Sequence, residues 1–250
     1  MPKINADSNR SFMCHQTIGT TRKIQIGNTT YIVKSVFKNS GPTKADCIEY
    51  LIKKKIKQIG DNEMKKIPTL FERVFENHKK VGILPNIAPG MEWVLEGKGT
   101  ATVKYDGSCC AIINGELYKR YDAKHGKKAP EGAIPCCEPD PVTGHHPHWL
   151  KVDENEPADR WFVAAYEATP KTEIHEGTYE AIGLHFNSNR YNLDKDILVR
   201  HGEDMVEVER TFEGIRKYLE EHNIEGLVFW KDGYPACKIK RSDFGFPWPN

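Results

Sequence analysis

Lys104 begins the short pattern K-x-D-G, which ends at Gly107. A lysine amine becomes a covalent nucleophile when burial or neighbouring cations lower its pKa. The glycine allows a tight turn and a close approach of the backbone to a ligand. Alone the pattern is weak evidence, because a Lys–Asp pair in a turn is more often an exposed surface feature. Its significance depends on the other charged residues of the chain.

A second group of charged residues falls in a hairpin predicted near the end of the chain. Asp232-Gly233 is a two-residue turn signal between the predicted strands Ile224–Trp230 and Tyr234–Arg241. Counting outward from this turn places Glu225 opposite Lys240.

The same count places Lys238 opposite Leu227, so Glu225, Lys238 and Lys240 are predicted to project from one face. Such a set is often a cross-strand salt bridge on a solvated surface. Leu227 and Phe229 fall on the same face, however, which argues against full exposure to solvent. We therefore predict a site for phosphate and a metal ion on this face.

Other elements must position these residues. Asn114-Gly115 predicts a type I′ turn between Cys109–Ile113 and Glu116–Tyr121, and this register returns Arg120 to the K-x-D-G pattern. The remaining pattern predicts helices at Leu70–His78 and Glu203–Glu221, strands near Trp93, at Trp161–Glu167 and at Thr178–Ile182, and an irregular segment over 122–160.

Residues 1–60 are predicted to form a separate appendage, a flexible lead followed by a small ββα unit. Its hairpin is expected between Arg22 and Phe37, and its helix is expected to begin at Thr43. After a short polar linker, residues 64–250 are predicted to form the main domain.

The composition is that of a globular protein. Of 250 residues, 38% are hydrophobic and 28% are charged, with a net charge of +1. No apolar run reaches membrane-spanning length and no secretory signal is visible, so we expect a cytoplasmic protein without membrane attachment. Nucleic-acid binding must then come from local patches. The run Lys119–Lys128 is one candidate, and its alternative is a solubilising loop.

The seven cysteines include two adjacent pairs and are expected to be reduced thiols. Cys136 and Cys137 are followed by a group of histidines, which raises the question of zinc. The spacing matches no standard zinc finger, and adjacent cysteines chelate one ion poorly, so we do not predict a zinc site. The histidines are His145, His146 and His148.

Four stretches follow the order of nucleotidyltransferase motifs I, III, IV and V. They are Lys104–Gly107, Thr178–Gly183, Ile224–Phe229 and Cys237–Lys240. In this order they resemble the covalent nucleotidyltransferases, which comprise ATP-dependent DNA and RNA ligases and mRNA capping enzymes. The runs KRYDAKHGKKAPEGAIPC and PDPVTGHHPHW extend the match, so residues 64–250 resemble the compact ATP-dependent RNA 5′–3′ ligase family.

The resemblance implies an α+β nucleotidyltransferase domain, with antiparallel sheets, flanking helices and the nucleotide between the sheets. The chain ends shortly after Lys240, so no C-terminal OB domain is expected. Capping enzymes and most DNA ligases resemble longer proteins that have one, which favours an RNA ligase.

The resemblance also implies roles for individual residues. Lys104 is expected to attack the α-phosphorus of ATP, while Lys238 and Lys240 neutralise charge on that phosphate. Glu180 is expected to contact the ribose, and Glu225 to organise Mg²⁺ or Mn²⁺. The residues expected to bind the nucleotide are Asp106, Gly107, Arg120, Glu180, Glu225, Lys238 and Lys240.

The implied function is the joining of RNA 5′-phosphate and 3′-hydroxyl ends through a covalent lysyl–AMP intermediate. The alternatives are nick sealing of the DNA ligase type, and a module that binds nucleotide or RNA ends without turnover. Oligomeric state is not predicted.

One position departs from the family pattern. Val103 occupies the place where many RNA ligases have a glutamate that recognises adenine. The base contact must then come from elsewhere, for example from Glu96 or the backbone. Phe186 and Tyr191 are the candidate aromatic residues for stacking on adenine, although neither belongs to a clear motif.

Overall fold

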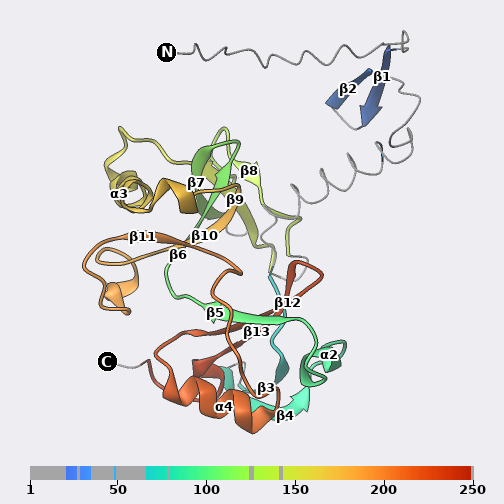
Figure 1. Ribbon diagram of the computed structural model, residues 1–250, viewed down its shortest axis with the longest axis vertical. Helices are drawn as coiled ribbons and strands as arrows, with labels where there is room; N and C mark the ends of the chain where they lie inside the picture. Colours follow the sequence, from blue (N-terminus) through green and yellow to red (C-terminus); the bar gives the residue numbers. More distant parts are fainter. Residues whose placement is uncertain are drawn as a thin grey trace, which may run out of the picture. The chain divides into compact units, whose positions relative to one another are not determined.

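The computed structural model describes residues 21–26, 29–34, 48, 66–77, 79–123, 127–140 and 143–248. The chain divides into two units, Met1–Ile56 and Lys57–Asn250. In the first unit, β1 (Thr21–Ile26) and β2 (Thr29–Lys34) form an antiparallel hairpin (Figure 1), which confirms the predicted pair of strands. The helix predicted from Thr43 falls largely outside the described residues, and the division of the chain at 60 and 64 stays a prediction.

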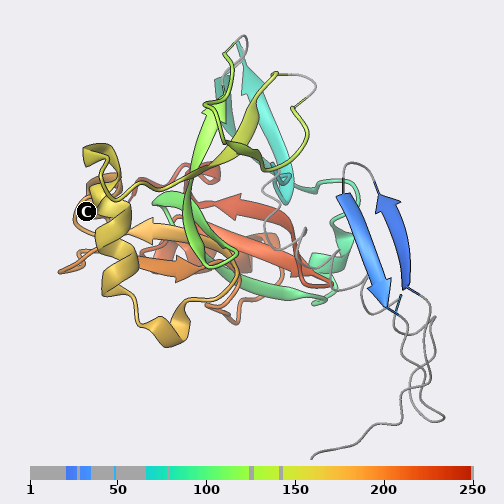
Figure 2. The ribbon, with the colours of Figure 1, turned by 90° about the horizontal axis from the view of Figure 1, so that it is seen from above.

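The larger sheet of the second unit has six antiparallel strands in the order β11-β10-β6-β7-β9-β8. The helix α3 (Arg160–Ala168) packs on one side of this sheet (Figure 2), where Ala165 joins a buried cluster with Tyr179 and Leu198. The strands are β6 (Ser108–Ile113), β7 (Glu116–Ala123), β8 (Ile134–Pro135), β9 (His146–Lys151), β10 (Gly177–Ile182) and β11 (Ile197–Arg200).

The smaller sheet has three antiparallel strands in the order β13-β12-β5, and a separate hairpin, β3-β4, lies near it (Figure 1). Leu227, Phe229 and Ile239 are fully buried in one core cluster with Ile215 and Leu219 of α4 (Phe212–Glu221). The strands are β3 (Phe71–Glu76), β4 (Lys79–Ile87), β5 (Thr100–Lys104), β12 (Gly226–Lys231) and β13 (Tyr234–Lys240).

Both tight turns expected in this unit are confirmed. Asn114 and Gly115 have φ values of 54° and 79°, and Ile113 pairs with Glu116 as predicted. Asp232 and Gly233 have φ values of 53° and 84°. Asparagine, aspartate and glycine tolerate this left-handed backbone, which matches the twist of the strands that the turn connects.

Several short apolar segments have a different structure from the one predicted. The expected helix at Leu70–His78 contains strand β3, and the expected strand near Trp93 is the short helix α2 (Glu92–Leu95). The expected strand at Trp161–Glu167 is helix α3. A short apolar run fits a buried strand and a buried helix equally well, and only the neighbouring elements decide between them.

Two boundaries also differ. The helix expected over Glu203–Glu221 begins only at Phe212, because Thr211 caps it by accepting a hydrogen bond from the Gly214 N–H (2.9 Å). The segment 122–160, expected to be irregular, includes the strand β9, which lies between β7 and β8 in the larger sheet.

At the level of fold class, the prediction of an α+β architecture with antiparallel sheets is confirmed. Within the described ranges, none of the helices combines the length and the apolar character that a membrane crossing requires.

Candidate active site

The K-x-D-G residues connect the two sheets of the larger unit. Lys104 is the last residue of β5, where it pairs with Gly226 of β12. Ser108 begins β6 of the six-stranded sheet. The turn between them therefore holds the Lys104 ammonium at the junction of the two sheets.

Gly107 allows this turn to lie directly against β10. A Cβ atom at Gly107 would stand 2.2 Å from the carbonyl oxygen of Ala181 and 2.7 Å from Cγ2 of Ile182. The Gly107 N–H donates to Oε1 of Glu180 at 3.0 Å. Glycine is therefore required here for close packing, and this packing places Glu180 beside the turn.

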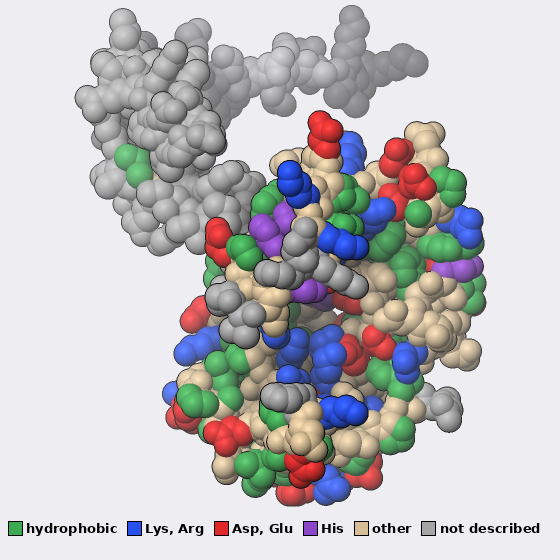
Figure 3. Space-filling model, turned by 180° about the vertical axis from the view of Figure 1, so that it is seen from behind, with side chains coloured by type: hydrophobic (Ala, Val, Ile, Leu, Met, Phe, Trp, Pro, Cys, Tyr) green, Lys and Arg blue, Asp and Glu red, His purple; other side chains and the backbone are tan. Residues whose placement is uncertain are grey.

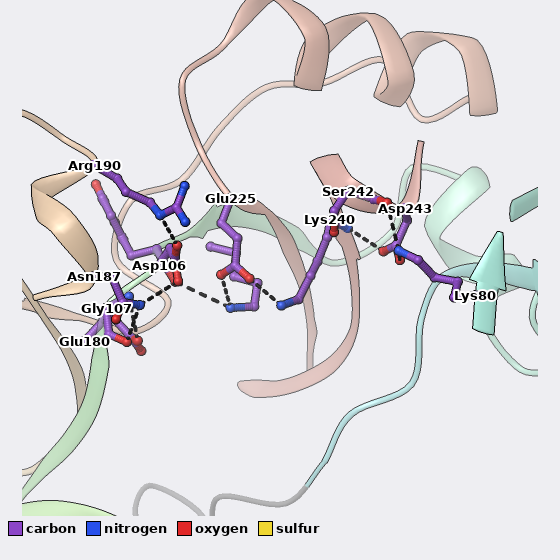
Figure 4. Close-up of polar contacts among 12 residues, drawn as sticks. Lys80, Asp106, Gly107, Glu180, Asn187, Arg190, Glu225, Lys240, Ser242 and Asp243 are labelled. Atoms are coloured by element: carbon purple, nitrogen blue, oxygen red, sulfur yellow. Dashed lines mark hydrogen bonds and ion pairs between the residues drawn. The ribbon is translucent and has the colours of Figure 1, made fainter. Parts of the chain in front are cut away.

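Glu225 lies between two of the predicted lysines (Figure 4). Its Oε2 accepts a hydrogen bond from the Lys104 ammonium, and its Oε1 accepts one from the Lys240 ammonium. The Glu225 side chain is largely buried, so these are charge-assisted contacts in a partly desolvated place. The structure thus joins the predicted nucleophile, the predicted metal carboxylate and one predicted phosphate-binding lysine.

The strand register that led to this grouping is wrong by one residue. Leu227 pairs with Ile239, and Lys238 pairs with Val228, because Ala236 is an extra residue that forms a bulge after Pro235.

The faces change accordingly. Leu227 and Phe229 are buried in the core cluster together with Cys237 and Ile239, not on the face of the lysines. Glu225 comes before β12, so strict alternation along the strand does not set its direction. It reaches the lysines because Gly226 lets β13 approach, with the Ile239 carbonyl 2.1 Å from where a Cβ would stand.

Lys238 is the third lysine of the group. Burial, and then the positive charges of Lys104 and Lys240, lower the pKa of Lys238 to about 8. Among the described residues, no hydrogen bond or ion pair joins its ammonium to a carboxylate. Lys238 is thus a cation that is only weakly compensated, which favours the binding of an anion at this place.

Glu180 is held from two sides. Besides the Gly107 N–H, it contacts Nε2 of His201 through Oε2 (3.0 Å), and His201 Nδ1 lies 3.0 Å from the hydroxyl of Thr178. His201 was not found from the sequence. It comes directly after β11, and no spacing signal relates it to the predicted motifs.

Asp106 is engaged by the protein itself. Its Oδ1 accepts from Nδ2 of Asn187 (2.7 Å), its Oδ2 pairs with Nε of Arg190 (2.9 Å), and its N–H donates to the Tyr191 hydroxyl (2.6 Å). The expected nucleotide-binding Asp106 therefore fixes the turn through these contacts.

The segment that makes these contacts was also missed. Asn187, Ser188, Asn189 and Asn192 all have positive φ values, between 42° and 62°. Clustered asparagines were the available signal, because asparagine tolerates the left-handed backbone that such a tight loop needs.

A cavity of about 1320 Å³ opens between the two sheets. Lys104, Gly107, Glu180 and Lys238 line it together with Arg120, whose Nε donates to Asp122 at 2.8 Å. Figure 3 shows Lys and Arg side chains gathered around a hollow in the middle of one face. A cavity of this size accommodates a nucleotide.

The candidates for adenine recognition lie elsewhere. Phe186 is buried in the core, where it packs edge-on against Phe162. Tyr191 packs edge-on against Tyr105 and Trp248, and Glu96 pairs with Lys98 at 2.5 Å. None of these three residues is among those that line the cavity.

The cysteine and histidine group gathers around β9. His148 is buried, and its Nδ1 lies 2.8 Å from the His146 carbonyl, while Cys136 is buried beside Trp149. Within the part of the chain that the structure describes, no three His, Cys, Asp or Glu residues come together in a way that suits a metal ion.

Two known proteins that share one name are similar to this chain. No protein-family model matches the chain. A rat (Rattus norvegicus) protein named RNA ligase 1 is 28% identical over 225 aligned residues, covering 60% of this chain and 68% of the relative. An orangutan (Pongo abelii) protein of the same name is 24% identical over 224, covering 59% and 68%. The expected resemblance to RNA ligases is thereby confirmed, at a distant level.

Proposed function

Because this chain is a distant relative of RNA ligases, we propose that it is an ATP-dependent RNA ligase acting through a lysyl–AMP intermediate. The observation that best supports this is the sharing of Glu225 by Lys104 and Lys240, beside the partly buried Lys238. An amine nucleophile among further cations suits attack on phosphorus, where negative charge accumulates in the transition state. In this proposal the two antiparallel sheets form a nucleotidyltransferase fold with the nucleotide between them.

In the first step, the Lys104 amine attacks the α-phosphorus of ATP. A nitrogen–phosphorus bond forms, and the bond from that phosphorus to the β-phosphate oxygen breaks, with its electron pair leaving on pyrophosphate. Lys104 loses one proton before the attack and a second as the new bond forms. Glu225, in contact with the ammonium, is placed to accept the first.

Lys238 and Lys240 stabilise the charge that develops on the phosphate oxygens. Glu180 and Arg120 border the cavity from the larger sheet, where they would bind the ribose and the RNA end. In the later steps, AMP passes to an RNA 5′-phosphate, and an RNA 3′-hydroxyl then displaces it to seal the strand.

A divalent ion at this site would have few protein ligands. Glu225 is the one carboxylate between the lysines, and both its oxygens already accept hydrogen bonds. Mg²⁺ commonly binds through one or two carboxylates, substrate phosphates and water. Glu225 would therefore hold Mg²⁺ or Mn²⁺ together with the ATP phosphates, and the ion would supply further charge neutralisation.

The test is the intact mass of the protein after incubation with ATP and Mg²⁺. The wild-type chain is expected to gain one AMP, and Lys104→Ala is expected to gain none. Lys98→Ala is the matched control, because Lys98 is an exposed lysine that pairs with Glu96 and belongs to none of the four motif stretches. A wild-type chain that binds ATP but gains no AMP would identify a binding module instead of a ligase.

Substrate choice needs a second measurement. We expect a 5′-phosphorylated RNA to be sealed much faster than its all-DNA counterpart, because proteins distinguish the two through the 2′-hydroxyl. Equal sealing of both would reject the RNA assignment and favour nick sealing of the DNA ligase type.

A further inference from the structure

A second, smaller cavity of about 440 Å³ lies beside the proposed active site. Four of its lining side chains are cationic and none is acidic. The lining residues are Lys66, Ile67, Pro68, Thr69, Arg73, Lys238 and Lys240. Lys66 and Arg73 belong to none of the four motif stretches, so the sequence pattern assigns them no role.

The positive charges of this cavity are only partly balanced. Arg73 shares Asp243 with Lys80, through Oδ1 at 3.1 and 2.8 Å, and Lys240 shares Glu225 with Lys104. Lys66 has an ion pair with Asp140 at 3.6 Å. Three carboxylates thus contact five cations in and behind the cavity, and this excess of positive charge attracts an anion to its mouth.

Arg73 also presents an unused donor. Its Nη2 contacts Asp243, but its Nε is buried and makes no hydrogen bond within the described part of the chain. A buried donor without a partner costs free energy, and an oxyanion is the partner that a guanidinium binds best. The Arg73 side chain lines the cavity and is 30% exposed, so its guanidinium can contact a phosphate-like ligand there.

The wall of the cavity is held in place by backbone contacts. Lys238 N–H donates to the Pro68 carbonyl (3.0 Å), and Leu70 N–H donates to the Lys238 carbonyl (2.8 Å). Thr69 forms a parallel bridge with Lys238. The segment before β3 thus runs alongside β13, which fixes the distance between the new cations and the site lysines.

The smaller cavity is adjacent to the larger one, on the side of Lys238 and Lys66. Glu225, Lys240 and Asp243 lie in a row (Figure 4), with the K-x-D-G turn at one end and Lys80 at the other. Lys238 and Lys66 line both the smaller cavity and the larger one. A phosphate chain that starts at Lys238 therefore has a cationic place for its remaining phosphates away from the nucleoside.

We propose that the smaller cavity binds the β- and γ-phosphates of the nucleoside triphosphate and holds pyrophosphate as it leaves. This inference rests on the proposed function. Displacement at phosphorus proceeds with the attacking and leaving groups roughly in line. Lys66 and the Arg73 guanidinium would keep the leaving group at that position while Lys104 attacks.

The test compares the first step with the last step in the full-length chain. In Arg73→Gln, we expect the KM for ATP in adduct formation to rise about tenfold, as for loss of one charged hydrogen bond. Inhibition of that step by added inorganic pyrophosphate should weaken by a similar factor. Sealing of an RNA supplied with a 5′-adenylyl group should be unchanged, because that reaction contains no pyrophosphate.

Lys66→Ala is the second variant, and it serves if Arg73→Gln does not fold. We expect a smaller rise in KM for ATP, since the Lys66 side chain is 74% exposed. Lys217→Ala is its matched control, because Lys217 is 73% exposed, has a glutamate partner and lies on α4. The control should behave as the wild type in every assay.

The outcomes separate the possible ligands. Unchanged dependence on ATP and pyrophosphate in both variants would overturn the proposal. Slower sealing of adenylylated RNA with normal ATP dependence would instead assign the cavity to an RNA phosphate.

If the wild type forms no adduct, the proposed function fails, and calorimetry with inorganic pyrophosphate still decides about the cavity. Wild-type binding that Arg73→Gln weakens would support the phosphate site. Equal or absent binding in both would reject it.

Discussion

The two sheets that border the large cavity contribute different kinds of chemistry. The three-stranded sheet brings Lys104, Lys238 and Lys240 together around Glu225. The six-stranded sheet contributes Glu180, which is held by the Gly107 N–H and by His201. Concentrated charge is thus on the small sheet, and well-bonded polar groups are on the large one.

The burial of one face of the three-stranded sheet explains why its charged side chains gather on the other face. One face of β12 and β13 is fully buried, with Leu227, Phe229, Cys237 and Ile239 all at 0% exposure. Alternation along the strands then places every charged side chain of β13 on the other face. Three lysines near one carboxylate repel each other, so this sheet is expected to favour chemistry at the expense of stability.

The largest predicted effect tests whether the cations that stabilise the transition state come mainly from the three-stranded sheet. Lys240→Ala and Lys238→Ala should each slow adduct formation about 10²–10³-fold, as for loss of a transition-state charge contact. Arg120→Ala, on the larger sheet, should slow the same step far less. Single-turnover rates with ATP measure both, and equal losses would contradict the division.

The second prediction concerns the turn that joins the sheets. Gly107→Ala should lower the free energy of unfolding by about 1–3 kcal/mol, because the added methyl group overlaps Ala181 and Ile182. Adduct formation should slow as well, since Lys104 and Glu180 would move apart. Denaturant unfolding gives the stability change. Gly82→Ala is the control, because nothing lies within 4 Å of a Cβ there, and comparable destabilisation by it would remove the argument from packing.

A third prediction tests the bonded network of the larger sheet. His201→Ala should raise the KM for ATP about tenfold, because a carboxylate that loses its supporting hydrogen bond is less well positioned. His201→Gln can still donate to Glu180 and should restore part of the affinity. If both variants behave alike, the hydrogen bond is not the cause.

A fourth prediction concerns the stability cost of the small sheet. In the folded chain the pKa of Lys238 is about 8, below the ordinary lysine value of 10.5, because the ammonium is partly desolvated and lies near Lys104 and Lys240. The unfolded chain then binds the extra proton more tightly, so stability rises with pH between these two values. Below about pH 8 the free-energy cost of the partly buried ammonium is fully present.

Lys238→Met should therefore raise the unfolding temperature at pH 7 and raise it less at pH 10.5, while adduct formation slows as in Lys238→Ala. Thermal unfolding at both pH values provides the measurement. Equal stabilisation at both would attribute the gain to packing of the methionine rather than to removal of charge.

The smallest effect is predicted for the basic run beyond β7. Lys127 and Lys128 are exposed, and Lys124 lies outside the described residues. Changing all three to alanine should slow sealing of RNA most at low salt, should make sealing less dependent on salt, and should spare adduct formation. Loss of adduct formation would place these lysines at the nucleotide instead.

Local signals in the sequence were enough for the hairpins and for the candidate charged set. Asn114-Gly115 and Asp232-Gly233 determine their turns because few residues accept the left-handed backbone. The order of the motif stretches indicated the covalent nucleotidyltransferases, and the runs KRYDAKHGKKAPEGAIPC and PDPVTGHHPHW indicated RNA ligases among them. The grouping of Glu225 with Lys240 was predicted correctly, although from a register that the bulge at Ala236 overturns.

The sequence by itself therefore determined which residue types carry the chemistry and which turns place them near one another. Tertiary structure decided which face of β13 is buried and whether Trp161–Glu167 is a strand or a helix. It also brought His201 to Glu180 and Arg73 to Lys238. The physical reason is range: turn geometry depends on adjacent residues, whereas burial and ion pairing depend on segments that are distant in the chain and meet only in the folded state.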